Sequence, residues 1–293
     1  MRRNQDVDPN GRLLHALVKR ALASSRMPAS SLLLEIAAGL LLILAGLYSV
    51  GAPIPAWGWT LVGLGMAAVF GSALFYNTHR HRKAFHYVEQ AYQLCRLMDV
   101  PAASLHLDEC LRDRNCPEPA RAMGLVELGH ICLAANQPLL AETAFEAAMK
   151  RRAALSADWL CRAEVGLAEA KLRNEQLTDA NATISRLLTR RLPQPWHSRV
   201  SLLTCLQRLY MGHTQDIAAR SNELWHEFRE HLGVEAGYGY GLLAAALDRC
   251  GQAAKALKYW SDATLLIRPE RLVQRYPELR ALAAKYGASA WPW

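Results

Sequence analysis

The chain has 293 residues, of which 52% are hydrophobic and 20% are charged, and its formal net charge is +8. The excess charge is uneven: residues 1–31 hold six basic and two acidic residues, whereas residues 84–293 are close to neutral. This distribution excludes a broad basic surface of the kind that binds nucleic acid. Alternating Val, Ile and Thr runs are missing and Ala, Leu, Arg and Glu dominate, so we expect an all-α protein.

The first predicted element is a short amphipathic helix over residues 10–26. Asn10 is expected to cap its start, and Pro28 is expected to stop it. Its apolar residues share one face, namely Leu14, Leu17, Val18, Ala21 and Leu22. A basic helix of this kind can lie in a membrane surface, so residues 1–31 are interpreted as a basic cytoplasmic segment with an interfacial helix.

Two apolar runs follow, over residues 32–50 and 56–76. Each is close to the roughly 20 residues that a helix needs to cross a bilayer. A turn rich in helix breakers joins them, and aromatic residues flank the second run. A signal peptide would be shorter and would begin earlier, and a buried soluble hairpin would show a polar stripe. The pattern therefore predicts a transmembrane hairpin over residues 32–76.

The predicted orientation follows from the basic flanks of the hairpin. Residues 77–83 form a juxtamembrane linker in which Arg80, Arg82 and Lys83 are expected to contact lipid headgroups. A metal cluster built on the neighbouring histidines is the alternative interpretation.

Seven scattered cysteines without a CxxC pair indicate reduced core thiols. We therefore expect an integral protein of the bacterial inner membrane with both termini in the cytoplasm.

Three small residues recur every fourth position in the second run, namely Gly63, Ala67 and Gly71. Such a stripe lets another helix approach closely. The expected partner is the first run of the same chain, and dimerisation is the alternative. Glu35 in the first run is expected to reach the interface or to pair with the end of the second run.

Self-similarity is the main signal after residue 84. The clearest unit covers residues 122–155, with large residues at Leu125, Leu128 and Phe145 and small ones at Gly129, Ala141 and Ala148. These landmarks resemble the tetratricopeptide repeat, a helix–turn–helix unit of about 34 residues. Further units start at 84, 161, 199 and 237, at steps of 38 or 39 residues. The resemblance implies a right-handed α-solenoid over residues 84–293, closed by a capping helix over 271–286.

The resemblance also implies which side chains meet a partner, because the first helix of each unit lines the groove of the solenoid. The corresponding positions are Tyr92, Arg96, His130, Glu169, Arg173, Gln207, Tyr210, Tyr238, Asp248 and Arg249. Their mixture of aromatic residues and arginine suits a peptide groove. The alternative is that each of these side chains is solvated or is paired within the chain.

No pattern of catalytic residues is present: the sequence lacks a Walker loop, an HExxH site and an evident nucleophile with its base. We therefore expect no enzyme activity, cofactor, metal or small-molecule substrate. The expected function is a membrane-anchored scaffold or adaptor that presents a cytoplasmic groove to a protein or peptide, in the assembly of a membrane complex. The alternative is a structural subunit of a membrane complex, held mainly through its hairpin, with membrane lipids as further partners.

Overall fold

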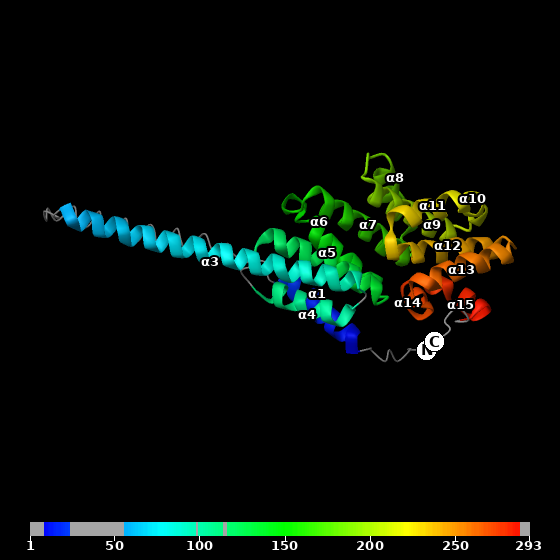
Figure 1. The fold of residues 1–293 in the computed structure, drawn as a ribbon, viewed down its shortest axis with the longest axis horizontal. Helices are drawn as coiled ribbons and strands as arrows, with labels where there is room; N and C mark the ends of the chain where they lie inside the picture. The colour runs from blue at the N-terminus through cyan, green and yellow to red at the C-terminus, as the bar shows by residue number, and fades with distance from the viewer. Residues whose placement is uncertain (1–8, 24–55, 98, 114–115, 288–293) are drawn as a thin grey trace.

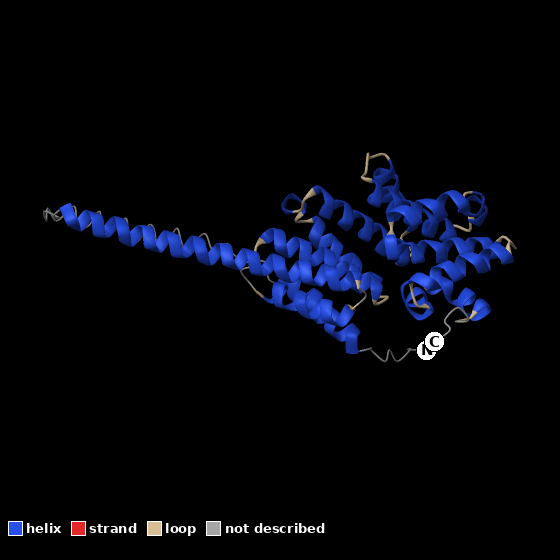
Figure 2. Ribbon diagram, viewed as in Figure 1, coloured by secondary structure: helices blue, strands red, loops and turns tan. Residues whose placement is uncertain are grey.

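The computed structural model describes residues 9–23, 56–97, 99–113 and 116–287 (Figure 1). Within these residues every regular element is a helix (Figure 2). The all-α part of the predicted fold class therefore agrees with the structure. Its cause is the abundance of Ala, Leu, Glu and Arg, which lose little side-chain freedom in a helix.

Successive helices pack against each other in pairs. The pairs are α3 (Ala56–Arg96) with α4 (Val100–Arg112), α5 (Glu118–Ala134) with α6 (Pro138–Met149), α7 (Ala157–Arg173) with α8 (Leu177–Leu188), and α12 (Ala236–Arg249) with α13 (Ala253–Leu266). Between the last two pairs, α9 (Gln194–Tyr210) packs on α10 (Thr214–Ala219) and α11 (Ser221–His231). The first helices α5, α7, α9 and α12 also contact one another in that order. We call these four helices the inner layer.

The same turn recurs at four places: between α5 and α6, between α7 and α8, between α9 and α10, and between α12 and α13. One residue of each turn has a positive φ: Asn136 (57°), Glu175 (62°), Gly212 (78°) and Gly251 (77°). The amide of the next residue then donates to a carbonyl five positions back, at 2.8–2.9 Å in all four turns. This bond closes the last turn of the first helix and satisfies a carbonyl that would otherwise lack a partner. The turn reverses the chain within three residues, so the second helix of each pair must return along the first.

Close packing between neighbouring pairs depends on glycines that face aromatic rings. A Cβ atom added at Gly129 in α5 would lie 2.6 Å from the Phe145 ring of α6, and one at Gly166 in α7 would lie 2.3 Å from the same ring. Phe145 is fully buried between these helices. Gly239 in α12 accepts the ring of Phe228 from α11 in the same manner. These glycines let helix backbones approach a large side chain that fills the space between them.

The N-terminal helix α1 (Pro9–Ala23) contacts α4, α5 and α6 (Figure 1). Its residues Leu14, Leu17, Val18 and Ala21 are buried in the core that α4, α5 and α6 share. The structure therefore places the predicted apolar face against protein, where its burial stabilises the fold. Asn10 does not precede the helix as predicted, because α1 already begins at Pro9; Pro28 lies outside the described residues.

The second predicted span and the predicted linker are parts of one continuous helix. Helix α3 runs from Ala56 to Arg96, and its N-terminal half extends away from the other labelled helices (Figure 1). Residues 77–83 are therefore helical and do not form a linker. Several apolar side chains of this half are exposed, namely Phe70, Leu74, Phe75 and Tyr76.

In the part of the chain that the structure describes, no helix has the combined length and apolar character that crossing a membrane requires. This finding contradicts the predicted transmembrane hairpin over 32–76 and the predicted integral membrane localisation. Residues 32–50 and Glu35 lie outside the described residues. The sequence argument treated 56–76 as a separate span, whereas these residues belong to a longer helix that carries charged side chains from Arg80 onward.

The small and basic residues of α3 lie in surroundings that differ from the predicted ones. Ala67 is exposed, and a Cβ at Gly71 would meet no described atom within 4 Å; the environment of Gly63 is outside the description. Arg80 lies 3.6 Å from the Asp113 carboxylate and stacks on the Tyr76 ring, so this basic residue has a partner in the protein. The predicted lipid contacts Arg82 and Lys83 are exposed, and Lys83 lies over the ring of Tyr87.

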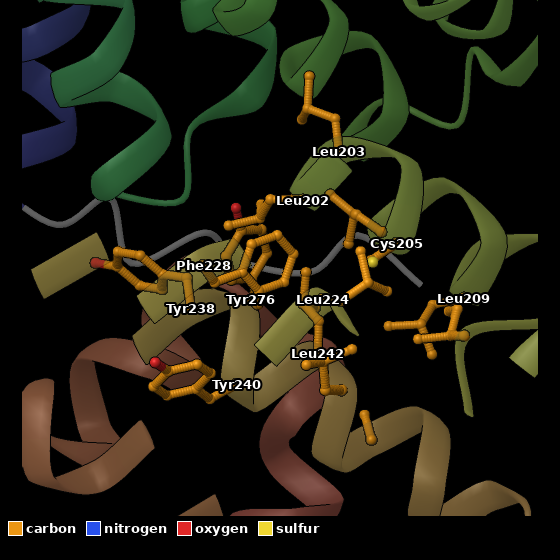
Figure 3. Close-up of a cluster of buried hydrophobic side chains, with 14 of the residues drawn as sticks. Leu202, Leu203, Cys205, Leu209, Leu224, Phe228, Tyr238, Tyr240, Leu242 and Tyr276 are labelled. Atoms are coloured by element: carbon orange, nitrogen blue, oxygen red, sulfur yellow. The ribbon is translucent and has the colours of Figure 1, made fainter. Parts of the chain in front are cut away.

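The C-terminal segment is not the single capping helix that 271–286 predicts. It consists of α14 (Pro269–Arg275), the 3-10 helix η3 (Pro277–Leu279) and α15 (Arg280–Tyr286). The break falls at Tyr276, whose extended backbone (φ −123°, ψ 88°) is the conformation that a residue before proline prefers. Because of this break, α14 contacts α5 and α12 while α15 packs on α13. Tyr276 itself is buried in a core cluster with side chains of the inner layer, and its ring meets that of Tyr238 edge to face, with centroids 5.5 Å apart (Figure 3).

Candidate functional site

A cavity of about 300 Å³ lies between the inner layer and α14. Its walls come from the end of α3, the start of α4, all four inner-layer helices, the 3-10 helix η2 (Gly233–Glu235) and α14. A volume of this size lies at the lower end of the range for ligand pockets. We call this space the cavity, and its most distinctive feature is a set of five arginines: Arg96, Arg162, Arg199, Arg271 and Arg275.

Arg162 of α7 is fixed by a carboxylate from α5. Its Nε donates to Oε1 of Glu127 at 2.6 Å, and Nη2 donates to Oε2 at 3.1 Å. Glu127 is 0% exposed, so its charge depends on this bidentate pair. The guanidinium also lies 4.9 Å from the centre of the Tyr92 ring and 5.9 Å from that of Trp159. The pair therefore presents a guanidinium of fixed orientation to the cavity.

A second pair joins α9 to η2. Arg199 donates from Nε and Nη2 to the same oxygen of Glu235, at 3.0 and 2.8 Å. The guanidinium lies 4.6 Å from the Trp196 ring, which also lines the cavity. Trp196 is held in turn by a hydrogen bond to Asp158 of α7. An aromatic face and a cation are thus kept together at one side of the cavity.

The third pair links residues that are 106 positions apart. Arg275 of α14 donates from Nη2 to both oxygens of Glu169 in α7, at 3.0 and 2.8 Å, and the Tyr276 hydroxyl donates to Glu169 at 3.0 Å. Arg275 also lies over the Tyr238 ring, at 4.8 Å. Burial disfavours its charge, but Glu169 holds the pKa of Arg275 well above its ordinary value. This contact, which we call the latch, fixes α14 as a wall of the cavity.

The two remaining arginines have no such carboxylate. Arg96 lies over the Tyr92 ring at 5.8 Å, and neither Arg96 nor Arg271 has a carboxylate within 4 Å among the described residues. Both side chains are exposed where they line the cavity. Three acidic residues, Glu127, Glu169 and Glu235, are paired with three of the five arginines. The cavity therefore has an excess of positive charge.

His130 of α5 lines the cavity among these arginines. Its Nε2 is buried and has no hydrogen-bond partner among the described residues. Its ring contacts Phe145 edge to face, with centroids 5.1 Å apart. Burial lowers the pKa of His130 well below its ordinary value, and the guanidiniums of Arg162, Arg275 and Arg199 lower it further. The imidazole is consequently neutral near pH 7.

Comparison of the chain with protein-family models, curated proteins and solved structures finds no match. Among the residues that the structure describes, no group of three or more His, Cys, Asp or Glu side chains is arranged to hold a metal ion. The chemistry of the cavity therefore has to be derived from its own geometry. That geometry combines five arginines, three of which are oriented by carboxylates, with the aromatic side chains of Trp196, Tyr238 and Tyr276 and one neutral imidazole.

Of the ten predicted groove residues, four line the cavity: Arg96, His130, Glu169 and Tyr238. Tyr92 lies next to it through its stacking on Arg162. The structure therefore brings together predicted residues from α3, α5, α7 and α12.

The other five predicted groove residues lie elsewhere, and each is held by the chain itself. Arg173 and Arg249 donate to the carbonyls of Leu133 and Leu209, and Gln207 donates to Asn181. Tyr210 donates to Glu278, and Asp248 accepts from Lys285 and Tyr286. The partners of Tyr210 and Asp248 lie in η3 and α15, so the C-terminal segment contacts these two residues. Each of the five residues thus has a partner within the chain in this structure.

Sequence reasoning did not identify five further residues that line the cavity. They are Trp196, Arg199, Glu235, Arg271 and Arg275. A signal for the buried pairs was present, because Glu127 and Glu169 interrupt helices that are otherwise mostly apolar or small, and a buried carboxylate needs a cation. No local signal identifies which arginine is the partner of Glu169.

Proposed function

We propose that this chain is a protein-interaction module that binds a peptide segment of a partner protein in the cavity. The observation that supports the proposal is the combination of Trp196, Tyr238 and Tyr276 with oriented guanidiniums around an open volume. Tyr, Trp and Arg are enriched among the residues that contribute most to binding energy at interfaces. The role proposed is that of a scaffold or adaptor, and it includes no catalytic step.

The helix pairs of residues 84–266 supply a rigid frame for this role, and we propose that they are tetratricopeptide-like units. The recurring turns and the glycine–aromatic contacts support this proposal, because they return the second helix along the first and let neighbouring helices pack closely. Cavity residues on four inner-layer helices are then held at set positions before a partner arrives. Binding to a preorganised surface avoids much of the entropy cost of ordering.

Selection from a random peptide library, displayed on phage, against the full-length chain tests this function. The decisive variant is Ala134→Trp, since Ala134 lines the cavity and is only partly buried, so the indole can enter the open volume. The matched control is Ala182→Trp on the exposed face of α8. We expect selected peptides to bind the unchanged chain and the control alike, and to bind the Ala134 variant at least about tenfold more weakly. Selection of no peptide, or equal binding by both variants, would contradict the proposed function.

A further inference from the structure

We propose that the segment bound in the cavity is acidic, with carboxylates that contact Arg96 and Arg271 and with His130 as a further contact to the bound segment. This inference rests on the proposed function and specifies the chemistry of the same site. The alternative occupants are a neutral peptide and a free inorganic anion, and the experiment below separates them.

The cavity contains positive charge that no carboxylate of the described residues neutralises. Three buried or partly buried carboxylates neutralise Arg162, Arg199 and Arg275, whereas Arg96 and Arg271 have no carboxylate partner within the described residues. Two guanidiniums without a carboxylate partner leave the exposed edge of the cavity positively charged, and this charge attracts an anion. A carboxylate can take two parallel hydrogen bonds from one guanidinium, which gives direction as well as attraction.

The arginines that are paired with carboxylates retain further hydrogen-bond donors. In both the Arg162 and the Arg199 pair, the protein carboxylate uses Nε and Nη2. The Nη1 group of each has no acceptor among the described residues. Each Nη1 group therefore keeps two N–H donors without an acceptor among these residues. A peptide supplies suitable acceptors in its backbone carbonyls, between the side-chain carboxylates that Arg96 and Arg271 would bind.

His130 lies among titratable groups from every element that borders the cavity. They are Glu127 from its own helix, Arg162 and Glu169 from α7, Arg199 from α9, Glu235 from η2, Arg271 and Arg275 from α14, and Arg96 with the uncharged Cys95 thiol from α3. Burial is the main cause that keeps the imidazole neutral, and the guanidiniums of Arg162, Arg275 and Arg199 add to it. A bound carboxylate offsets the repulsion from the guanidiniums, so it raises the pKa of His130.

Binding of an acidic segment is therefore linked to proton uptake by His130. Between the pKa of the free protein and the higher pKa of the complex, the complex holds the additional proton. The affinity for an acidic peptide must then rise as the pH falls through that interval. A neutral peptide does not change the field at His130, so it produces no such rise.

The experiment begins with the peptides that the unchanged full-length chain selects from the random library. We expect them to be enriched in Asp and Glu, and we expect replacement of those residues by Asn and Gln to weaken binding by at least about tenfold, the usual effect of losing a charge-assisted hydrogen bond. Arg271→Gln should remove most of this preference. The matched control Arg268→Gln, at an exposed arginine just before α14 that does not line the cavity, should retain it.

The pH profile supplies a second readout. The affinity of the acidic peptides should rise in the unchanged chain as the pH falls through the interval between the two pKa values of His130, and it should be flat in His130→Gln. Selected peptides that bind in the cavity but show neither acidic enrichment nor dependence on Arg271 would overturn the inference while leaving the proposed function intact. Displacement of those peptides by millimolar inorganic phosphate, without acidic enrichment, would identify a free anion as the ligand and would also overturn it. Selection of no peptide, by contrast, is the failure of the proposed function itself.

Discussion

Glu127 and Arg162 illustrate at the scale of single residues why the cavity can hold charge. The carboxylate is 0% exposed and receives two hydrogen bonds from one guanidinium. Removing one member of a buried pair leaves the other charged and without a partner, which costs far more than the pair contributes in net stability. The arrangement thus favours a defined orientation of Arg162 more than it favours overall stability.

We therefore expect Glu127→Gln to lower the free energy of unfolding by about 3 kcal/mol. The control is Glu118→Gln, because Glu118 makes a salt bridge with Arg151 from a largely exposed side chain; its loss should cost less than about 1 kcal/mol. Urea denaturation followed by circular dichroism measures both values. Equal effects of the two substitutions would show that the buried pair is not the stronger constraint.

His130 gives a prediction on pH and stability. Its pKa is lowered in the folded protein, so between the folded and the unfolded pKa the unfolded chain binds the additional proton. The contribution of His130 to the free energy of unfolding is therefore fully present above the ordinary histidine pKa. It decreases as the pH falls below that value, by at most ~1.4 kcal/mol per pH unit. His130→Gln should flatten this part of the stability profile, whereas the exposed control His86→Gln should leave it unchanged. Thermal unfolding between pH 5 and 7 provides the comparison.

At the scale of elements, Phe145 joins three helices through two glycines. A Cβ at position 166 would lie 2.3 Å from the Phe145 ring, so Gly166→Ala forces α7 away from α6. We expect a loss of about 1–3 kcal/mol, the usual cost of overpacking a core. The second substitution Phe145→Leu should recover part of that loss in the double variant. The control Gly71→Ala, which meets no described atom within 4 Å, should leave stability unchanged or raise it by up to about 1 kcal/mol.

Local patterns predicted the elements that depend on local interactions. The apolar residues at 14, 17, 18 and 21 do form the buried face of a helix, because this pattern follows from helical spacing. The apolar run 56–76 was misinterpreted, because helix formation and high hydrophobicity do not by themselves define where a helix ends. The contacts of Tyr210 and Asp248 with the C-terminal segment could not be predicted, because the position of that segment depends on contacts between residues far apart in the sequence.

At the scale of the whole molecule, the latch determines whether the cavity has a second wall. Glu169 receives hydrogen bonds from both Arg275 and Tyr276, and Tyr276 is 1% exposed. Glu169→Gln keeps the size of the side chain but removes the charge that Arg275 requires. We expect α14 to lose its attachment to α7 while the preceding helix pairs remain folded.

Hydrogen exchange measured by mass spectrometry tests this expectation. In Glu169→Gln, amides of residues 269–286 should exchange at least about tenfold faster, and those of α5 and α7 should change little. The control Glu270→Gln, an exposed residue in the first turn of α14, should leave the pattern unchanged. Uniform acceleration along the chain would mean that Glu169 supports the whole fold and not the attachment of α14.

The latch also determines when a newly synthesised chain becomes able to bind a partner in the cavity. Each helix pair contacts mainly its neighbours in sequence, so the pairs can form one after another as they leave the ribosome. The cavity cannot form in this stepwise manner, because one of its walls is α14. The ribosome reaches α14 about a hundred residues after Glu169. Until Tyr276 has emerged, the arginines of α7 and α9 face open solvent and not an enclosed site. A partner that contacts both walls therefore distinguishes chains translated through Tyr276 from shorter nascent ones, and binding is delayed until the inner layer has assembled.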